Sequence, residues 1–197
     1  HYPPAEDFDV INLRSGSHDM SSRGAYMSNR FTDDSMLDMG NIAPHGRFVH
    51  LYLNGNYWGQ YHLRERWSAD MASSYFGGSE DDYEAVNAND NFRNDENVYD
   101  GSGQFWSKTK RLLSRPNPFT NAADHIDIAN IVDFMLLWVS GNSESEFRAF
   151  GSETRGIPFK FMIKDADGFL RSPGHSANHA GPYSVMSRMR SGVNADD

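Results

Sequence analysis

Residues 47–63 read RFVHLYLNGNYWGQYHL and carry the clearest structural pattern in the sequence. On both sides of Asn54-Gly55, apolar residues alternate with other residues, which is typical of strands that turn one face to a core. Asn-Gly is the preferred pair for a two-residue type I′ turn, because both central positions of that turn need a positive φ. The pattern therefore predicts an antiparallel β-hairpin over 47–63, with strands at 47–53 and 56–63.

Two amphipathic helices are expected after the hairpin. Ser68 is a good N-cap residue and Gly77-Gly78 is a good stop, which together predict a helix over 69–76. A second helix is expected over 104–113, because a proline-rich segment follows it and ends the helical pattern.

The predicted core is built on one long helix and one strand. Residues 128–140 follow Asp127 as N-cap and are apolar almost all round, which predicts a buried central helix. In the run 157–163, Phe159, Phe161 and Ile163 alternate with other residues, as in a strand. With no internal repeat or linker, we expect a single α+β domain over the whole chain, 1–197.

The remaining segments carry weaker signals. A short apolar alternation at 8–13 is a candidate strand, and the rest of 1–46 is typical of loop or short helix. Residues 79–103 are acidic, Asn-rich and weakly apolar, so we expect an irregular surface segment there. One short helix is expected at 183–190.

Composition excludes several classes of protein. The chain has 18 Lys and Arg against 27 Asp and Glu, a net charge of −9, which argues against nucleic acid as a partner. No apolar run of about 18 residues occurs, so no transmembrane segment is expected. Residues 1–4 are neither basic nor strongly apolar, so no retained signal peptide is expected either. Cysteine is absent, which removes disulfides, thiolate metal sites and cysteine nucleophiles.

Two pairs of acidic residues follow predicted core elements. Asp165 and Asp167 come directly after the strand 157–163 and could aim two carboxylates at one divalent cation, although acidic residues are also ordinary in turns. Glu144 and Glu146 follow the long helix, where a loop on a rigid element can present a general base. Solvated loop carboxylates are the alternative for this pair.

Other candidate residues have two readings each. His175 and His179 have the spacing of a helical zinc pair, but the Pro- and Gly-rich sequence around them does not favour a helix. In Arg64-Glu65-Arg66, a guanidinium either contacts an anion or pairs with a neighbouring carboxylate, and the sequence favours neither.

The aromatic residues of the predicted hairpin either stack on a planar or sugar ligand or pack across the strands, and packing is the commoner role. They are Tyr52, Tyr57, Trp58 and Tyr61. Motifs of the common NTPases, dinucleotide-binding enzymes, serine hydrolases and zinc proteases are all absent from the sequence.

Three stretches together resemble the CotH kinase-like family, named after spore coat protein H. They are 11–19, which reads INLRSGSHD, the hairpin region 39–66, and 160–169. The hairpin is the specific part, since it is similar to the family signature YLNGxYWGxYxLxER almost residue for residue. The resemblance spans roughly residues 8–190.

The resemblance implies an atypical protein-kinase-like fold that transfers the γ-phosphoryl group of ATP to a Ser or Thr hydroxyl of a protein, with Mg²⁺ or Mn²⁺. Such proteins are secreted or lie at the cell surface of bacteria and eukaryotes. By position, Asp165 resembles the family's metal-binding Asp, and Asp167 is its neighbour and can share the ion. Arg64 and Glu65, in the signature, are the candidate cofactor contacts.

The sequence also departs from the family. Glu144 stands where the family's catalytic Asp is expected, after Gly141-Asn142, and it is therefore the candidate base. A Lys-bearing strand is expected before residue 8, yet the lysines are Lys108, Lys110, Lys160 and Lys164. We therefore expect a fragment or a copy that has lost part of its nucleotide site. The alternative function is a pseudokinase: an inactive extracellular module that binds a protein partner and is stabilised by Ca²⁺.

Overall fold

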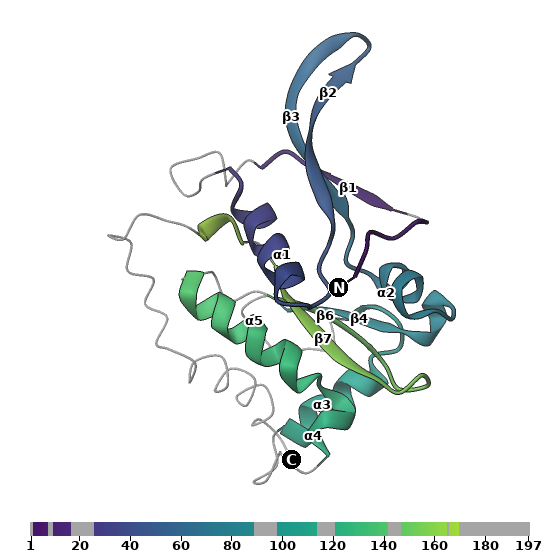
Figure 1. The fold of residues 1–197 in the computed structure, drawn as a ribbon. Coiled ribbons are helices and arrows are strands. Elements are labelled where there is room, and N and C mark those ends of the chain that lie inside the picture. The colour runs from purple at the N-terminus through teal and green to yellow at the C-terminus, as the bar shows by residue number, and fades with distance from the viewer. Residues whose placement is uncertain are drawn as a thin grey trace.

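The computed structural model describes residues 2–7, 10–16, 26–88, 98–113, 121–141, 147–164 and 166–169. The structure is a mixed α+β arrangement of helices and two antiparallel sheets (Figure 1), in agreement with the predicted α+β class. In chain order the elements are β1 (Ile11–Arg14), α1 (Ser28–Asp38), β2 (Gly46–Leu53), β3 (Asn56–Glu65), α2 (Ala69–Phe76), η1 (Glu80–Asp82), β4 (Glu84–Ala88), β5 (Val98–Asp100), α3 (Gln104–Leu113), α4 (Ala122–His125), α5 (Ile128–Gly141), β6 (Phe147–Ser152), β7 (Ile157–Ile163) and η3 (Ala166–Gly168).

The predicted hairpin is confirmed and forms most of a three-stranded antiparallel sheet, which we call the hairpin sheet. Its strand order is β1-β3-β2, and its far end extends away from the rest of the molecule (Figure 1). Asn54 and Gly55 have φ values of 49° and 80°, as a type I′ turn requires. The strand expected at 8–13 is β1, which runs from Ile11 to Arg14 and pairs with the base of β3.

The second sheet has four antiparallel strands in the order β5-β4-β6-β7, and we call it the core sheet. Alternate side chains on its strands enter two separate hydrophobic clusters, one on each face. Helices α1, α3 and α5 contribute to the first cluster and α2 to the second. Phe159, Phe161 and Ile163 of β7 share the first cluster, as the alternation in the sequence predicts.

The prediction of an irregular surface segment at 79–103 is wrong for 79–88 and 98–103, and residues 89–97 lie outside the described residues. This segment contains β4, which lies between β5 and β6 inside the core sheet. Glu84 of β4 is buried because its carboxylate accepts hydrogen bonds from the backbone N–H groups of Phe105 and Trp106, at 3.1 and 2.9 Å. The negative charge of Glu84, which suggested a surface position, thus caps the N-terminus of α3.

The prediction that 128–140 is a buried central helix is correct for one face only. Phe134 and Trp138 of α5 are buried in the first cluster, whereas Ile128, Val132 and Leu136 are exposed, Leu136 by 58%. These three residues follow one another at intervals of four and therefore share one side of the helix. Among the residues that the structure describes, the apolar residues on this side of α5 are therefore not packed in the core.

Other local predictions are confirmed. Ser68 caps α2 by accepting a hydrogen bond from Met71 N at 3.2 Å, and helix α3 has the predicted bounds. Within 1–46, α1 is longer than the short helix expected there. The helix expected at 183–190 lies outside the described residues. Among the helices that the structure describes, none has both the length and the apolar character of a membrane span.

Candidate functional site

A basic cavity of about 330 Å³ lies between the hairpin sheet and the core sheet. Four cationic side chains line it, two from the hairpin sheet and two from β6 and the end of β7, and none of its lining residues in the described part of the chain is acidic. The lining residues are Asn12, Leu13, Arg14, Arg64, Arg148, Met162, Ile163 and Lys164. A space lined by cations from both sheets favours an anion, because the anion lowers the electrostatic energy of the positive charges around it.

Arg14, at the end of β1, contacts the turn that follows β7. Its Nη2 donates to both carboxylate oxygens of Asp167, at 2.7 and 2.8 Å, and its Nη1 donates to Asn29 Oδ1 at 3.2 Å. Asn29 also donates to Asp167 and accepts a hydrogen bond from Ala166 N at 3.1 Å. The first turn of α1 therefore joins one cavity arginine to the 166–169 turn.

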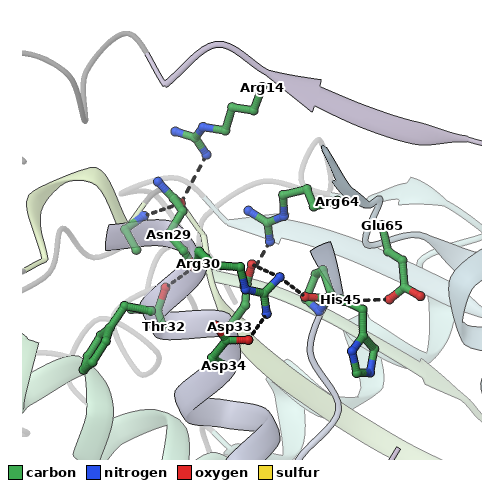
Figure 2. A network of polar contacts seen from close by, with 12 residues as sticks. Arg14, Asn29, Arg30, Thr32, Asp33, Asp34, His45, Arg64 and Glu65 are labelled. Atoms are coloured by element: carbon green, nitrogen blue, oxygen red, sulfur yellow. Dashed lines mark hydrogen bonds and ion pairs between the residues drawn. The ribbon is translucent and has the colours of Figure 1, made fainter. Parts of the chain in front are cut away.

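Arg64, near the end of β3, contacts a different part of α1. Its Nη2 donates to Asp33 Oδ1 at 3.1 Å, and both Arg14 and Arg64 point toward α1 (Figure 2). The Arg64 side chain is only 10% exposed, and its Nε has no hydrogen-bond partner among the described residues. Burial lowers the pKa of Arg64 and Asp33 opposes this effect, while Arg14 and Arg148 lower it further.

The electrostatics around Arg64 also affect two neighbouring groups. Burial raises the pKa of Asp33 to about 6, in spite of the guanidinium groups of Arg64 and Arg30. Burial lowers the pKa of His62 to about 3, and Arg64 and Arg30 lower it in the same direction. His62 is therefore neutral at pH 7, and the cavity wall is positive because of its arginines.

Glu65, the other candidate cofactor contact, makes hydrogen bonds within the protein. Its carboxylate accepts from Ala5 N at 3.0 Å, from His45 N at 2.9 Å and from Tyr75 Oη at 2.9 Å. Burial and the nearby carboxylate raise the pKa of Tyr75. Glu65 thus joins the N-terminal segment, the start of β2 and helix α2, which is a structural task that the sequence pattern did not reveal.

The candidate catalytic and metal-binding residues are only partly described. Glu144 and Asp165 lie outside the described residues, as do Glu146, His175 and His179. Asp167 is buried, and both of its carboxylate oxygens accept hydrogen bonds from Arg14. In the described part of the chain, no group of three or more His, Asp and Glu side chains could hold a metal ion.

The aromatic residues of the hairpin lie away from the cavity. Tyr52 and Tyr57 face each other across the strands with ring centroids 5.3 Å apart, which agrees with the predicted cross-strand packing. Both are exposed, and so is Trp58. They do not line the basic cavity.

Sequence reasoning missed most of the cavity. Arg14 belongs to one of the stretches that resemble the family, but nothing in its local sequence showed that it would face Arg148 and Lys164. Asp33 lies in a polar helix with a weak apolar pattern, in which no acidic residue stood out. Only the meeting of the two sheets brings these residues together.

Two comparisons bear on the identity of the chain. The model of the family described as CotH kinase protein matches residues 2–150, which is more than half of the sequence. A search of curated proteins found no match. The matched segment contains β1, α1, the hairpin and β6 up to Phe150, and so includes three of the four cavity cations. The chain belongs to the CotH kinase protein family.

Proposed function

We propose that this chain is a secreted or cell-surface kinase that transfers the γ-phosphoryl group of ATP to a Ser or Thr hydroxyl of a protein. Membership of the CotH kinase family implies ATP and a kinase-like fold. The observation that carries the proposal is the basic cavity, whose cations come from both sheets. Phosphoryl transfer depends on positioning the phosphates and on stabilising their charge, and such a cavity is suited to both tasks.

The cavity side chains fit the phosphate groups of ATP. Guanidinium groups form paired hydrogen bonds with phosphate oxygens, and Lys164 adds a compact positive charge. The Nε of Arg64 is fully buried and is therefore out of reach of a ligand, so the donors that contact a phosphate are those of its two terminal nitrogens. We propose that Arg14, Arg64, Arg148 and Lys164 hold the phosphates.

Asp165 is the proposed main ligand of a Mg²⁺ or Mn²⁺ ion. It directly follows Lys164, which lines the cavity, and carboxylate oxygens are the ligands that these hard cations prefer. Asp167 fits this role less well in the described arrangement, because Arg14 and Asn29 already donate to its oxygens. Asp167 would join the ion only by exchanging those hydrogen bonds.

Glu144 is the proposed general base. In the reaction, the substrate hydroxyl oxygen bonds to the γ-phosphorus while the bond to the β-phosphate oxygen breaks. The proton of the hydroxyl passes to the carboxylate of Glu144, and ADP leaves. Glu in place of the family's Asp moves the carboxylate by roughly one methylene, a displacement that matters in a reaction governed by positioning.

A second candidate function is an inactive kinase-derived module that binds an extracellular protein partner, stabilised by Ca²⁺. The Arg14–Asp167 ion pair favours the loss of phosphoryl transfer, because a carboxylate that already has a cationic partner has less to gain from a catalytic metal ion. For the same reason, Asp167 is not the proposed Ca²⁺ ligand of the module. The two functions differ in whether a phosphoryl group is transferred.

The test combines ATP binding by calorimetry with transfer from radiolabelled ATP in the presence of Mn²⁺. We expect Arg148→Ala to weaken ATP binding about tenfold, which is the loss of one charge-assisted hydrogen bond. The matched control is Arg155→Ala, which removes an arginine at the surface turn between β6 and β7. We expect Asp165→Ala to reduce transfer by about 10²-fold or more.

Three outcomes separate the candidates. Transfer that is lost in Asp165→Ala supports the kinase. ATP binding that weakens in Arg148→Ala, without transfer by either the unmodified chain or its Glu144→Asp variant, supports the inactive module. A chain that binds no ATP contradicts the proposed role of the cavity.

A further inference from the structure

Two buried residues of α1 each hold one arginine of the basic cavity. Asn29 accepts a hydrogen bond from Arg14, and Asp33 accepts one from Arg64. The two residues are four apart, so they lie on the same side of the helix, one turn from each other. Both are buried, Asp33 being only 3% exposed. Helix α1 therefore contacts the cavity only indirectly, through the two arginines of the hairpin sheet.

The carboxylate of Asp33 lies near two arginines but accepts its hydrogen bond from Arg64. Its Oδ2 has no hydrogen-bond partner and lies 3.9 Å from Arg30 Nη1. Arg30 itself is engaged elsewhere, because it donates to Asp34 at 2.6 Å and to the carbonyl oxygen of Pro44 at 3.0 Å (Figure 2). The hydrogen bond to Arg64 is thus the main interaction of a fully buried carboxylate.

Such a buried ion pair contributes little to the stability of the fold. Removing two charges from water is unfavourable, and a single hydrogen bond between them offsets only part of this cost. Arg64 also keeps a buried Nε without a partner, which adds a further cost. The ion pair is better explained as preorganisation of Arg64 for a ligand. An arginine side chain that is already ordered loses less rotamer entropy when it binds an anion.

We infer that Asp33 is a positioning residue, which holds the Arg64 guanidinium in the orientation that binds an anionic phosphate or sulfate group in the cavity. This inference rests on the proposed function, since it assumes that the cavity binds the phosphates of ATP. Asp33 touches no ligand itself, because it does not line the cavity.

The inference predicts the sign of a mutational effect. Asp33 is a negative charge close to a site for anions, so its electrostatic effect alone opposes anion binding. Asp33→Asn removes this charge and should then strengthen binding, if electrostatics were all that mattered. If Asp33 positions Arg64, the same substitution weakens binding in spite of the more favourable charge.

The first experiment measures the affinity for sulfate and for ATP by calorimetry at pH 7.5 without added metal. We expect Asp33→Asn to weaken the binding of both anions about tenfold. Asp34→Asn is the matched control, because it removes the same charge from the next residue of α1, whose partner is Arg30 rather than Arg64. We expect that control to change the affinity by less than about twofold.

A second variant tests the inference even if Asp33→Asn does not fold. Arg64→Lys retains the charge but replaces the planar fork with a single ammonium group, which cannot contact Asp33 and an anion in the same way. We expect it to weaken sulfate binding by a similar factor, and thermal unfolding without ligand checks that each variant is folded. An Arg64→Lys variant with unchanged affinity contradicts the inference.

The pH profile supplies a readout that a purely structural role would not affect. Asp33 has a pKa raised to about 6, so it loses its charge between pH 7.5 and 5. The charged groups that act on it are Arg64, Arg30, Asp34 and Arg14. The neighbouring His62 stays neutral over this interval.

Sulfate does not titrate in this range, which makes it the suitable probe. We expect the sulfate affinity of the unmodified chain to fall as the pH drops through about 6, toward that of Asp33→Asn, whose own profile should be flatter. A wild-type chain that binds neither sulfate nor ATP overturns the proposed function together with this inference. A wild-type chain that binds both, with Asp33→Asn equal or tighter, overturns the positioning role alone.

Discussion

The hairpin sheet and the core sheet differ in where their side chains lie. The strands of the core sheet are covered on both faces, and Ala85, Val86, Ala149 and Phe161 are fully buried. Most of the hairpin sheet is exposed or half-buried, apart from the base of β3, where His62 and Glu65 are buried. The difference indicates that the core sheet contributes most of the stability. The base of the hairpin sheet contributes Arg14 and Arg64 to the cavity.

The largest expected effect is in the core sheet. Phe161 is fully buried, and its ring lies 5.3 Å from that of Phe147 and 6.1 Å from that of Phe134, measured between centroids. We expect Phe161→Ala to lower the free energy of unfolding by about 3–5 kcal/mol, because it leaves a cavity that the neighbouring rings cannot fill. Urea unfolding measures this loss.

The control for Phe161 is the same substitution in the hairpin sheet. Phe48 of β2 is half-buried and stacks on Tyr26 with centroids 5.5 Å apart. We expect Phe48→Ala to cost clearly less than Phe161→Ala. Equal losses for the two variants would contradict the division between the sheets.

A smaller effect is expected from pH at the base of β3. The pKa of His62 is lowered from 6.5 to about 3, so between these values the unfolded chain binds a proton that the folded protein does not. The stability that this contributes is present above pH 6.5 and is lost as the pH falls toward 3. Asp33 acts in the opposite direction, because its raised pKa contributes stability that is present below pH 3.8 and lost as the pH rises through about 6.

We therefore expect His62→Phe to reduce the loss of stability on acidification. For one group that is protonated only in the unfolded chain, lowering the pH from 6.5 to 4.5 lowers the free energy of unfolding by about 2.7 kcal/mol. Partial solvent screening reduces the effect expected for His62, between pH 7 and 4.5, to about 1–2 kcal/mol. His50→Phe is the matched control, because His50 is an exposed histidine of the same hairpin. A His62→Phe variant with the acid sensitivity of the unmodified chain would show that His62 is protonated in the folded state.

The smallest effect is expected at the far end of the hairpin. Trp58 is 62% exposed, so Trp58→Ala removes few buried contacts and should change the free energy of unfolding by no more than about 0.5 kcal/mol. Trp106 of α3 is 3% exposed and packs edge-on against Phe159 with centroids 5.0 Å apart. Trp106→Ala should therefore cost about 3–5 kcal/mol, by the same urea unfolding measurement. Similar losses in the free energy of unfolding for the two variants would mean that the far end of the hairpin contributes as much to stability as the hydrophobic core.

Local features of the sequence predicted what local interactions decide. Asn54-Gly55 determined the turn, because few other pairs adopt two positive φ values at low cost. Ser68 and Gly77 determined the ends of α2, since a side-chain oxygen caps the first turn and a glycine at φ 75° ends the last. The hairpin signature also indicated the family, because its residues follow one another in a single continuous stretch of the chain.

The tertiary structure decided everything that depends on residues distant in the chain. Local sequence did not show that β4 lies inside a sheet, because the burial of Glu84 depends on backbone N–H groups about twenty residues further on. It did not separate the buried face of α5 from the exposed one, since both are apolar. The cavity has the same origin: Arg14 and Arg64 come from one sheet, Arg148 from the other, and only the packing of the two sheets places their charges around one space.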